Sequence, residues 1–203
     1  MKTFSLLLAV TGLIATSFVS QATIFTMGSP VVNPANGHTY YLLSTGSWSD
    51  SEAFAQTLGG NLTTINDSAE NQWVYSTFTS LATSLTSQSD PELWIGFYDP
   101  VTNDGNGAQH AADFVWVDGE PVTYTAWKTG QPDNSAGVEY YTQISGPLDF
   151  QNSQWNDLMN SGGGAAGFIY GVVEVVPEPQ SYAFLLVCVG AFIMSRRKPL
   201  VTG

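Results

Sequence analysis

The sequence predicts one mixed α+β domain with an apolar segment at each end of the chain. Two stretches early in the body place apolar residues at helical spacing behind a capping residue, which is typical of amphipathic helices. The second half instead alternates short apolar runs with long polar loops, which favours strands. Aromatic residues make up 13% of the chain, which is ample for the core of one domain.

The first elements expected in the body are a strand over residues 38–43 and a helix that follows it. Either Ser49 or Asp50 can cap this helix, and Gly59-Gly60 stops it. Its apolar residues at helical spacing are Ala53, Phe54 and Leu58.

A second helix starts at Asp67 or Ser68. Its expected core stripe is Trp73, Val74, Phe78 and Leu81. The strands expected after it are residues 93–98, 114–117, 140–145 and 167–175. The run 99–107 is interpreted as a hairpin turn and not as a calcium loop, because it has no closing glutamate at the required spacing.

The body of the chain is strongly acidic. Of the 17 acidic residues only Glu178 lies outside residues 23–176, whereas Lys128 is the only basic residue inside that range. The other basic residues are Lys2, Arg196, Arg197 and Lys198. This balance excludes nucleic acid as a partner, since phosphates are bound by clustered lysine and arginine. A bound divalent cation would relieve part of the self-repulsion.

Residues 1–22 have the parts of a secretory signal peptide. Lys2 precedes an apolar run from Phe4 to Val19, and small residues stand at Ser20 and Ala22. We expect cleavage after Ala22, which leaves residues 23–35 as the N-terminal leader of the mature chain. A retained transmembrane helix is the alternative, but the apolar run is shorter than the roughly 20 residues that a span needs.

Oxygen-bearing side chains gather in two stretches of the second half. The first begins with Trp127 to Asn134 and a Gln-Pro-Asp triplet, and the second is Trp155-Asn156-Asp157. The triplet can aim both flanking side chains at one point if its X-Pro bond is cis. Carboxylate and amide oxygens are hard ligands that suit Ca²⁺. The candidate ligands are Gln131, Asp133, Glu139, Asn156 and Asp157.

These two stretches, with Leu93-Trp94-Ile95-Gly96-Phe97 and the run from Phe114 to Tyr124, stand in the order found in C-type lectin domains. Residues 36–176 resemble that family. The resemblance implies a C-type lectin-like fold, with two helices packed on short antiparallel β-sheets and a long loop region. It also implies a carbohydrate-binding protein and not an enzyme.

By the same resemblance, the five candidate residues would coordinate one Ca²⁺ and bind two neighbouring sugar hydroxyls. In the family, Gln-Pro-Asp goes with galactose-type ligands and Glu-Pro-Asn with mannose-type ligands. Gln131 and Asp133 therefore favour a galactose-type glycan, and an exopolysaccharide is the other expected ligand. Galactose binders usually carry an aromatic residue after the triplet, and residues 134–138 contain none. Monosaccharides are thus expected to bind weakly.

The domain departs from the family in its cysteines. Cys188, in the C-terminal apolar run, is the single cysteine of the chain, so the domain has no disulfides. Family members generally carry two bridges, and the resemblance places Ala55 and Val173 where one would be and Tyr141 at one half of the other. Stability is therefore expected to depend more on bound metal.

Residues 177–203 resemble the PEP-CTERM sorting signal of Gram-negative bacteria. Pro177-Glu178-Pro179 is followed by an apolar run from Tyr182 to Met194 and a basic end at residues 196–198. The run is short for a bilayer, and the basic end is typical of the cytoplasmic side. The resemblance implies transient inner-membrane insertion, recognition by an exosortase, and a protein exported to the cell surface or beyond. A plain membrane anchor is the alternative.

Other functions fit the residues less well. A matrix or adhesion protein that uses the same fold to bind protein is the main alternative. A hydrolase built on Asp133 and Glu139 is disfavoured, because metal-bound carboxylates are poor proton donors. His38 and His110 stand without another imidazole or thiol at ligand spacing, which argues against a zinc site.

Overall fold

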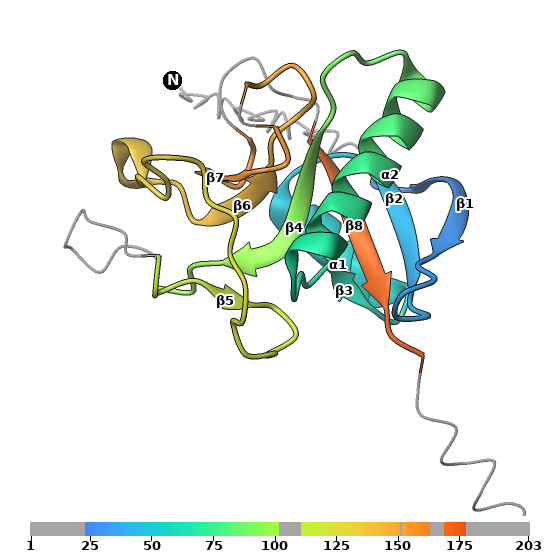
Figure 1. Cartoon of the computed structure of the whole chain (residues 1–203), viewed down its shortest axis with the longest axis horizontal. Helices are drawn as coiled ribbons and strands as arrows, with labels where there is room; N and C mark the ends of the chain where they lie inside the picture. Colours follow the sequence, from blue (N-terminus) through green and yellow to red (C-terminus); the bar gives the residue numbers. More distant parts are fainter. Residues whose placement is uncertain (1–22, 102–110, 151, 163–168, 178–203) are drawn as a thin grey trace, which may run out of the picture.

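The computed structural model describes residues 23–101, 111–150, 152–162 and 169–177 (Figure 1). The expected signal peptide, the PEP-CTERM-like segment after Pro177, Cys188, His110 and most of the 99–107 turn lie outside these residues. No helix in the described part combines the length and the apolar character that crossing a membrane requires.

The described residues form helices α1 (Trp48–Thr57) and α2 (Ser68–Thr86) and a short 3₁₀ helix, η1 (Ser135–Gly137). The strands are β1 (Thr26–Val32), β2 (Thr39–Thr45), β3 (Asn61–Leu62), β4 (Glu92–Tyr98), β5 (Val115–Trp116), β6 (Tyr141–Ile144), β7 (Trp155–Leu158) and β8 (Ile169–Val175). The predicted mixed class, two helices and long loop region are confirmed.

All the strands join one sheet, with the order β1-β2-β8-β4-β6-β7 along its main path. In addition, β3 pairs with β8 and β5 pairs with β4. Antiparallel sheets were expected, whereas β4 and β8 are paired in parallel. The parallel pair arises because the last strand returns to the middle of the sheet, between β2 and β4.

The two helices cover opposite faces of the central strands. Successive side chains of a strand point to opposite faces. In β2, Leu42 belongs to the main core cluster with Phe78 of α2, whereas Leu43 belongs to a second cluster with Ala55 of α1. Figure 1 shows the long α2 crossing β8. The sheet is therefore buried on both faces at β2 and β8.

Helix α1 begins two residues earlier than predicted. Its cap is Ser47, whose Oγ accepts a 3.1 Å hydrogen bond from the N–H of Asp50. Ala53, which was predicted on the apolar face, is exposed, and Glu52 is buried. The Glu52 carboxylate accepts a 2.8 Å bond from the N–H of Leu62, and burial raises its pKa.

Helix α2 is capped by Asp67, as predicted, through a 2.8 Å bond from the N–H of Glu70 to the Asp67 carboxylate. Its predicted stripe is also found in the core. Val74 and Phe78 are fully buried, while Trp73 and Leu81 are partly buried against the same cluster.

Three strands were not predicted. The segment read as a leader contains β1, which pairs with β2 although Gly28 and Pro30 lie within it. Strand β3 has two residues and depends on its pairing with β8. Strand β7 is the Trp155-Asn156-Asp157 stretch itself, which pairs with β6. In each case pairing with another strand, which the strand's own residues do not show, fixes it.

Apolar side chains occupy the positions where the resemblance places disulfides. Ala55 and Val173 are fully buried in one cluster that also contains Leu43. The ring of Tyr141 packs on Trp48 with their centroids 4.8 Å apart. Packing therefore fills the space, but the chain lacks the cross-link's effect on the unfolded state.

A cross-link at the first of these positions is expected to stabilise the protein. The pair Ala55→Cys and Val173→Cys should form a disulfide and raise the free energy of unfolding by about 2–4 kcal/mol. Urea denaturation with and without reductant measures the gain, and thiol titration should find only Cys188 free. The matched control pairs Val173→Cys with Ala53→Cys, because Ala53 lies on the same helix but faces solvent. No gain over this control would contradict the prediction.

Candidate metal and ligand site

The long loop that carries the Gln-Pro-Asp triplet is tied to strand β7. The N–H of Trp155 donates to the carbonyl of Ala126 at 2.7 Å, and the N–H of Lys128 donates to the carbonyl of Trp155 at 2.9 Å. Trp127 and Trp155 thereby form a parallel bridge. The bridge brings the triplet, a few residues further on, to the same end of the sheet as Asp157.

The buried side chain of Trp155 fixes strand β7 in the core. This side chain is fully buried and meets Trp116, Tyr124 and Trp127 edge-on, with centroid distances between 5.7 and 5.9 Å. Its indole N–H donates a 2.8 Å bond to the side-chain carbonyl of Asn71 in α2. The next two residues, which were predicted to be ligands, therefore start from a rigid position.

Asp157 holds the triplet directly. Its two carboxylate oxygens accept hydrogen bonds from the N–H of Asp133 at 3.1 Å and the N–H of Asn134 at 2.8 Å. The Gln131–Pro132 bond is cis, which is the geometry considered for aiming both flanking side chains at one point. Asp133 thus lies against β7 although the two segments are distant in sequence.

Glu139 is fixed by the turn that follows the triplet. Its N–H donates to the side-chain oxygen of Asn134, and its carboxylate accepts from the N–H of Ser135, both at 3.0 Å. Asn134 adopts a left-handed conformation with a φ of 45°, which asparagine tolerates better than most residues. The turn folds Glu139 back toward Asp133.

The outcome is a cluster of three carboxylates. One oxygen each from Asp133, Glu139 and Asp157 lies within 4.8 Å of the others. Glu139 and Asp157 are buried, and Asp133 is exposed. Burial raises the pKa of Glu139 to about 7, and the negative charges of Asp157 and Asp133 add to the effect. Burial also raises the pKa of Asp157, against the opposing effect of its N–H donors.

The cluster has the donor set of a hard-cation site. Its oxygens would repel one another when ionised, and no cationic side chain pairs with them among the described residues. The side-chain carbonyl of Gln131 is buried and has no hydrogen-bond partner in the described part of the chain. Three carboxylates and an unpaired amide oxygen fit Ca²⁺, which takes oxygen ligands.

The two predicted amide ligands lie beside the cluster. Gln131 lies two residues before Asp133, across Pro132. Asn156 is half-buried, and its amide N–H donates a 2.9 Å bond to the backbone carbonyl of Asp157. The structure therefore brings the three predicted carboxylates together, and Gln131 and Asn156 lie close to them in the chain.

The residues that hold these candidate ligands in place were not predicted. Asn134 positions Glu139, and Asn71 receives the indole N–H of Trp155. Asn134 follows the triplet directly, and asparagine before a tight turn is a local signal for such a role. Asn71 lies in a helix far from the loop, so no local pattern indicates it.

The metal-free protein is expected to lose stability as the pH rises from about 4.5 to about 7. The pKa of Glu139 is raised from 4.5 to about 7 on folding, so the folded state favours its protonated form. This contribution is complete below about pH 4.5 and is lost as the pH passes the folded pKa. Urea denaturation in chelator across this range measures it. Glu139→Gln should reduce the loss, and a profile identical to wild type would contradict the assignment.

The chain is similar to known lectins. The family model described as "Lectin C-type domain" matches residues 44–161. Echinoidin of Heliocidaris crassispina is 32% identical over 120 residues, covering 54% of this chain and 74% of that protein. The alpha-N-acetylgalactosamine-specific lectin of Patiria pectinifera is 32% identical over 128 residues, covering 61% of this chain and 68% of that protein.

The same likeness is found among solved structures. The C-type lectin CEL-I from Cucumaria echinata superposes with a TM-score of 0.51 at 26% identity, covering 68% of this chain and 90% of that chain. Human lithostathine superposes with a TM-score of 0.54 at 21% identity, covering 73% and 97% of the two chains, which bears on the fold alone. The relatives by sequence are lectins, which bind sugars and are not enzymes.

Proposed function

The chain belongs to the lectin C-type domain family, and from this premise we propose that it binds galactose-type glycans through a calcium ion held by its long loop. The family accounts for the C-type lectin-like fold and for carbohydrate binding as the general activity. The observation that supports the calcium site is the meeting of Asp133 and Glu139, from the long loop, with Asp157, from strand β7, within 4.8 Å.

Gln131 and Asn156 complete the proposed ligand set. A bound Ca²⁺ would supply open coordination positions for two neighbouring sugar hydroxyls. The protein's own side chains then bond the same hydroxyls, with carboxylates accepting hydrogen bonds and amide N–H groups donating them. Asp133 is exposed, so a ligand can reach this edge of the site. Asp157 and Glu139 are buried and would bind the ion on the side that faces the protein.

The sugar class follows from the order of amide and carboxylate around Pro132. Gln131 before Pro132 and Asp133 after it set where the site donates and where it accepts hydrogen bonds. The name of the Patiria relative, which specifies alpha-N-acetylgalactosamine, supports a galactose-type ligand. We expect millimolar affinity for a monosaccharide, or about −4 kcal/mol, and useful avidity on polymers.

Reversing the triplet is expected to reverse this preference. A competition series on immobilised protein in Ca²⁺ should rank galactose above mannose. The double change Gln131→Glu and Asp133→Asn keeps two oxygen ligands but exchanges their hydrogen-bonding roles, so it should favour mannose. A wild-type preference for mannose, or an unchanged ranking in the double variant, would show that the triplet does not set specificity.

The two ends of the chain indicate where the protein would act. We propose that residues 1–22 direct export and that residues 177–203 act as a PEP-CTERM-like signal, inserted transiently in the inner membrane of a Gram-negative bacterium and processed by an exosortase. The glycan would then be met outside the cell, at the surface or in an exopolysaccharide matrix. Mass spectrometry of the exported protein tests this, since an intact C-terminus would contradict processing.

A further inference from the structure

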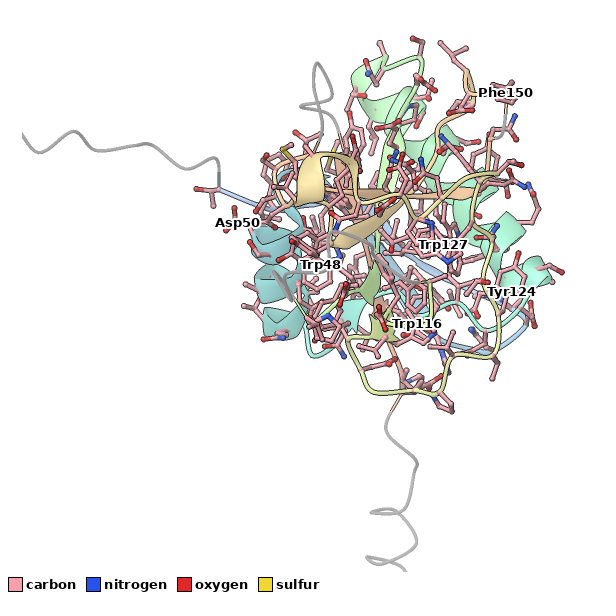
Figure 2. All side chains as sticks on the ribbon, turned by 90° about the vertical axis from the view of Figure 1, so that its left-hand side faces the viewer. Trp48, Asp50, Trp116, Tyr124, Trp127 and Phe150 are labelled. Carbon is pink, nitrogen blue, oxygen red and sulfur yellow. The ribbon has the colours of Figure 1, made fainter. Side chains whose placement is uncertain are left out.

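An open cavity of about 530 Å³ lies apart from the carboxylate cluster, between α2, the segment 124–127 and residues 153–154. None of Asp133, Glu139 and Asp157 lines it. The volume is within the range of small-molecule sites. Figure 2 shows Tyr124 and Trp127 close together on this side of the molecule, away from Trp48.

The cavity is electrically neutral, which is unusual in this chain. No charged residue lines it. A second cavity of about 410 Å³ offers a contrast, because it is lined by Asp67, Glu70, Asp118, Glu120 and Glu174. With sixteen acidic residues between positions 23 and 176, a lining of amides, hydroxyls and aromatic rings selects for a ligand without charge.

Two buried polar atoms of this lining have no partner. The indole N–H of Trp127 and the side-chain carbonyl of Gln154 are buried and unbonded within the described residues. By contrast, both ends of the Asn71 amide have a partner, since its N–H donates to the carbonyl of Ser153 and its carbonyl accepts from the indole N–H of Trp155. A buried donor and acceptor without partners cost free energy. Both atoms are covered in this structure, so a ligand in the cavity pairs with them only when the side chain of Trp127 or Gln154 turns toward it.

The other lining residues suit a sugar ring that has one apolar face. Tyr124 and Trp127 are half-buried, and both meet Trp155 edge-on, so the packing of the core fixes their orientation. At the rim, Gln72 and Thr125 are exposed and offer further donors and acceptors. Rigid aromatic surface together with amides and hydroxyls is the chemistry that recognises a neutral pyranose.

We propose that this cavity is a second, metal-independent binding site for one neutral sugar ring. It rests on the proposed function only for the ligand class, since a glycan held by the calcium site brings further sugars to the same protein. Trp155 lies between the two sites: Asp157 follows it in β7, and its ring contacts Tyr124 and Trp127. Two weak sites on one domain would strengthen binding to a polymer.

The test uses the full chain carrying Asp133→Ala, in chelator, so that the calcium site is disabled. Galactose and glucose are titrated separately while the indole N–H resonance of Trp127 is followed by NMR, with galacturonate as the charged probe. We expect a saturable shift in the millimolar range with a neutral sugar and none with galacturonate. Absence of a shift with both neutral sugars, or an equal shift with galacturonate, overturns the proposal.

A matched pair of variants locates the binding. Gln72→Glu places a charge at the rim and should weaken the sugar affinity about tenfold. Ser80→Glu places the same charge on an exposed position of the same helix outside the cavity and should leave it unchanged. Equal effects of the two variants would overturn the proposal. Failure of the calcium site is seen separately, as polymer binding by the wild-type protein that does not respond to Ca²⁺.

Discussion

Replacing Trp155 with alanine is expected to lower the free energy of unfolding by about 3–5 kcal/mol, or to unfold the domain. The side chain is fully buried, and its ring meets those of Phe97, Trp116, Tyr124 and Trp127. Truncation removes this contact area and leaves a cavity. It also leaves the Asn71 carbonyl without its indole donor. Urea denaturation followed by circular dichroism measures the loss.

Two further variants separate packing from binding. Trp155→Phe keeps most of the ring but removes the indole N–H, so it should cost only about 1–3 kcal/mol. Asn156→Ala changes a half-buried neighbour in the same strand and should have a small effect on the metal-free fold while impairing Ca²⁺-dependent sugar binding. If Trp155→Ala and Asn156→Ala had the same effect on unfolding, this division of roles would be wrong.

Adding Ca²⁺ is expected to stabilise the protein by about 2.7 kcal/mol when free Ca²⁺ is 100 times its dissociation constant. The gain arises because the ion binds the assembled carboxylates of the folded state, and the unfolded chain does not bring them together. Without disulfides in the domain, this contribution should be a large share of the total stability. Thermal or urea denaturation in Ca²⁺ and in chelator measures it.

Two carboxylate variants test this prediction, one inside the cluster and one outside it as the control. Asp157→Asn keeps the shape of the side chain but removes a charge from the site, so it should abolish the gain from Ca²⁺. Glu92→Gln removes a carboxylate in β4 whose pKa is also raised by burial, yet which lies outside the cluster. It should keep the full gain. A stability indifferent to chelator in the wild type would contradict the calcium assignment.

Local signals in the sequence were sufficient for the elements that depend on local interactions. The cap at Asp67 and the apolar spacing of Val74 and Phe78 predicted α2, because helix caps and stripes are encoded within a few residues. The same reasoning placed α1 two residues late. Its cap at Ser47 is followed by a buried glutamate, Glu52, that interrupts the expected apolar pattern.

The strands that were missed depend on pairing with another strand and not on their own residues. Strand β1 contains Gly28 and Pro30, which disfavour a strand by local propensity, and it exists because β2 pairs with it. Strand β8 could be recognised from its apolar run, but its parallel pairing with β4 could not. Parallel pairing is fixed by the path of the whole chain through the sheet.

The candidate site, too, was predicted only in part from the sequence. The residue types and spacing of Asp133, Glu139 and Asp157 pointed to metal binding, and the structure brings these three together. The bonds that hold them run from the N–H of Glu139 to the side-chain oxygen of Asn134 and from two backbone N–H groups to Asp157, and they required the folded loop. Residue chemistry thus indicates which side chains could bind a metal, whereas their positions are a property of the folded turn.

The measurement that tests the central claim most directly is the binding of a galactose-bearing polymer to immobilised protein as a function of free Ca²⁺. The account predicts that binding rises saturably with Ca²⁺ and falls at least about tenfold in chelator, and that Asp157→Asn shows no rise at all. Binding of the polymer that is equally strong in Ca²⁺ and in chelator would contradict it.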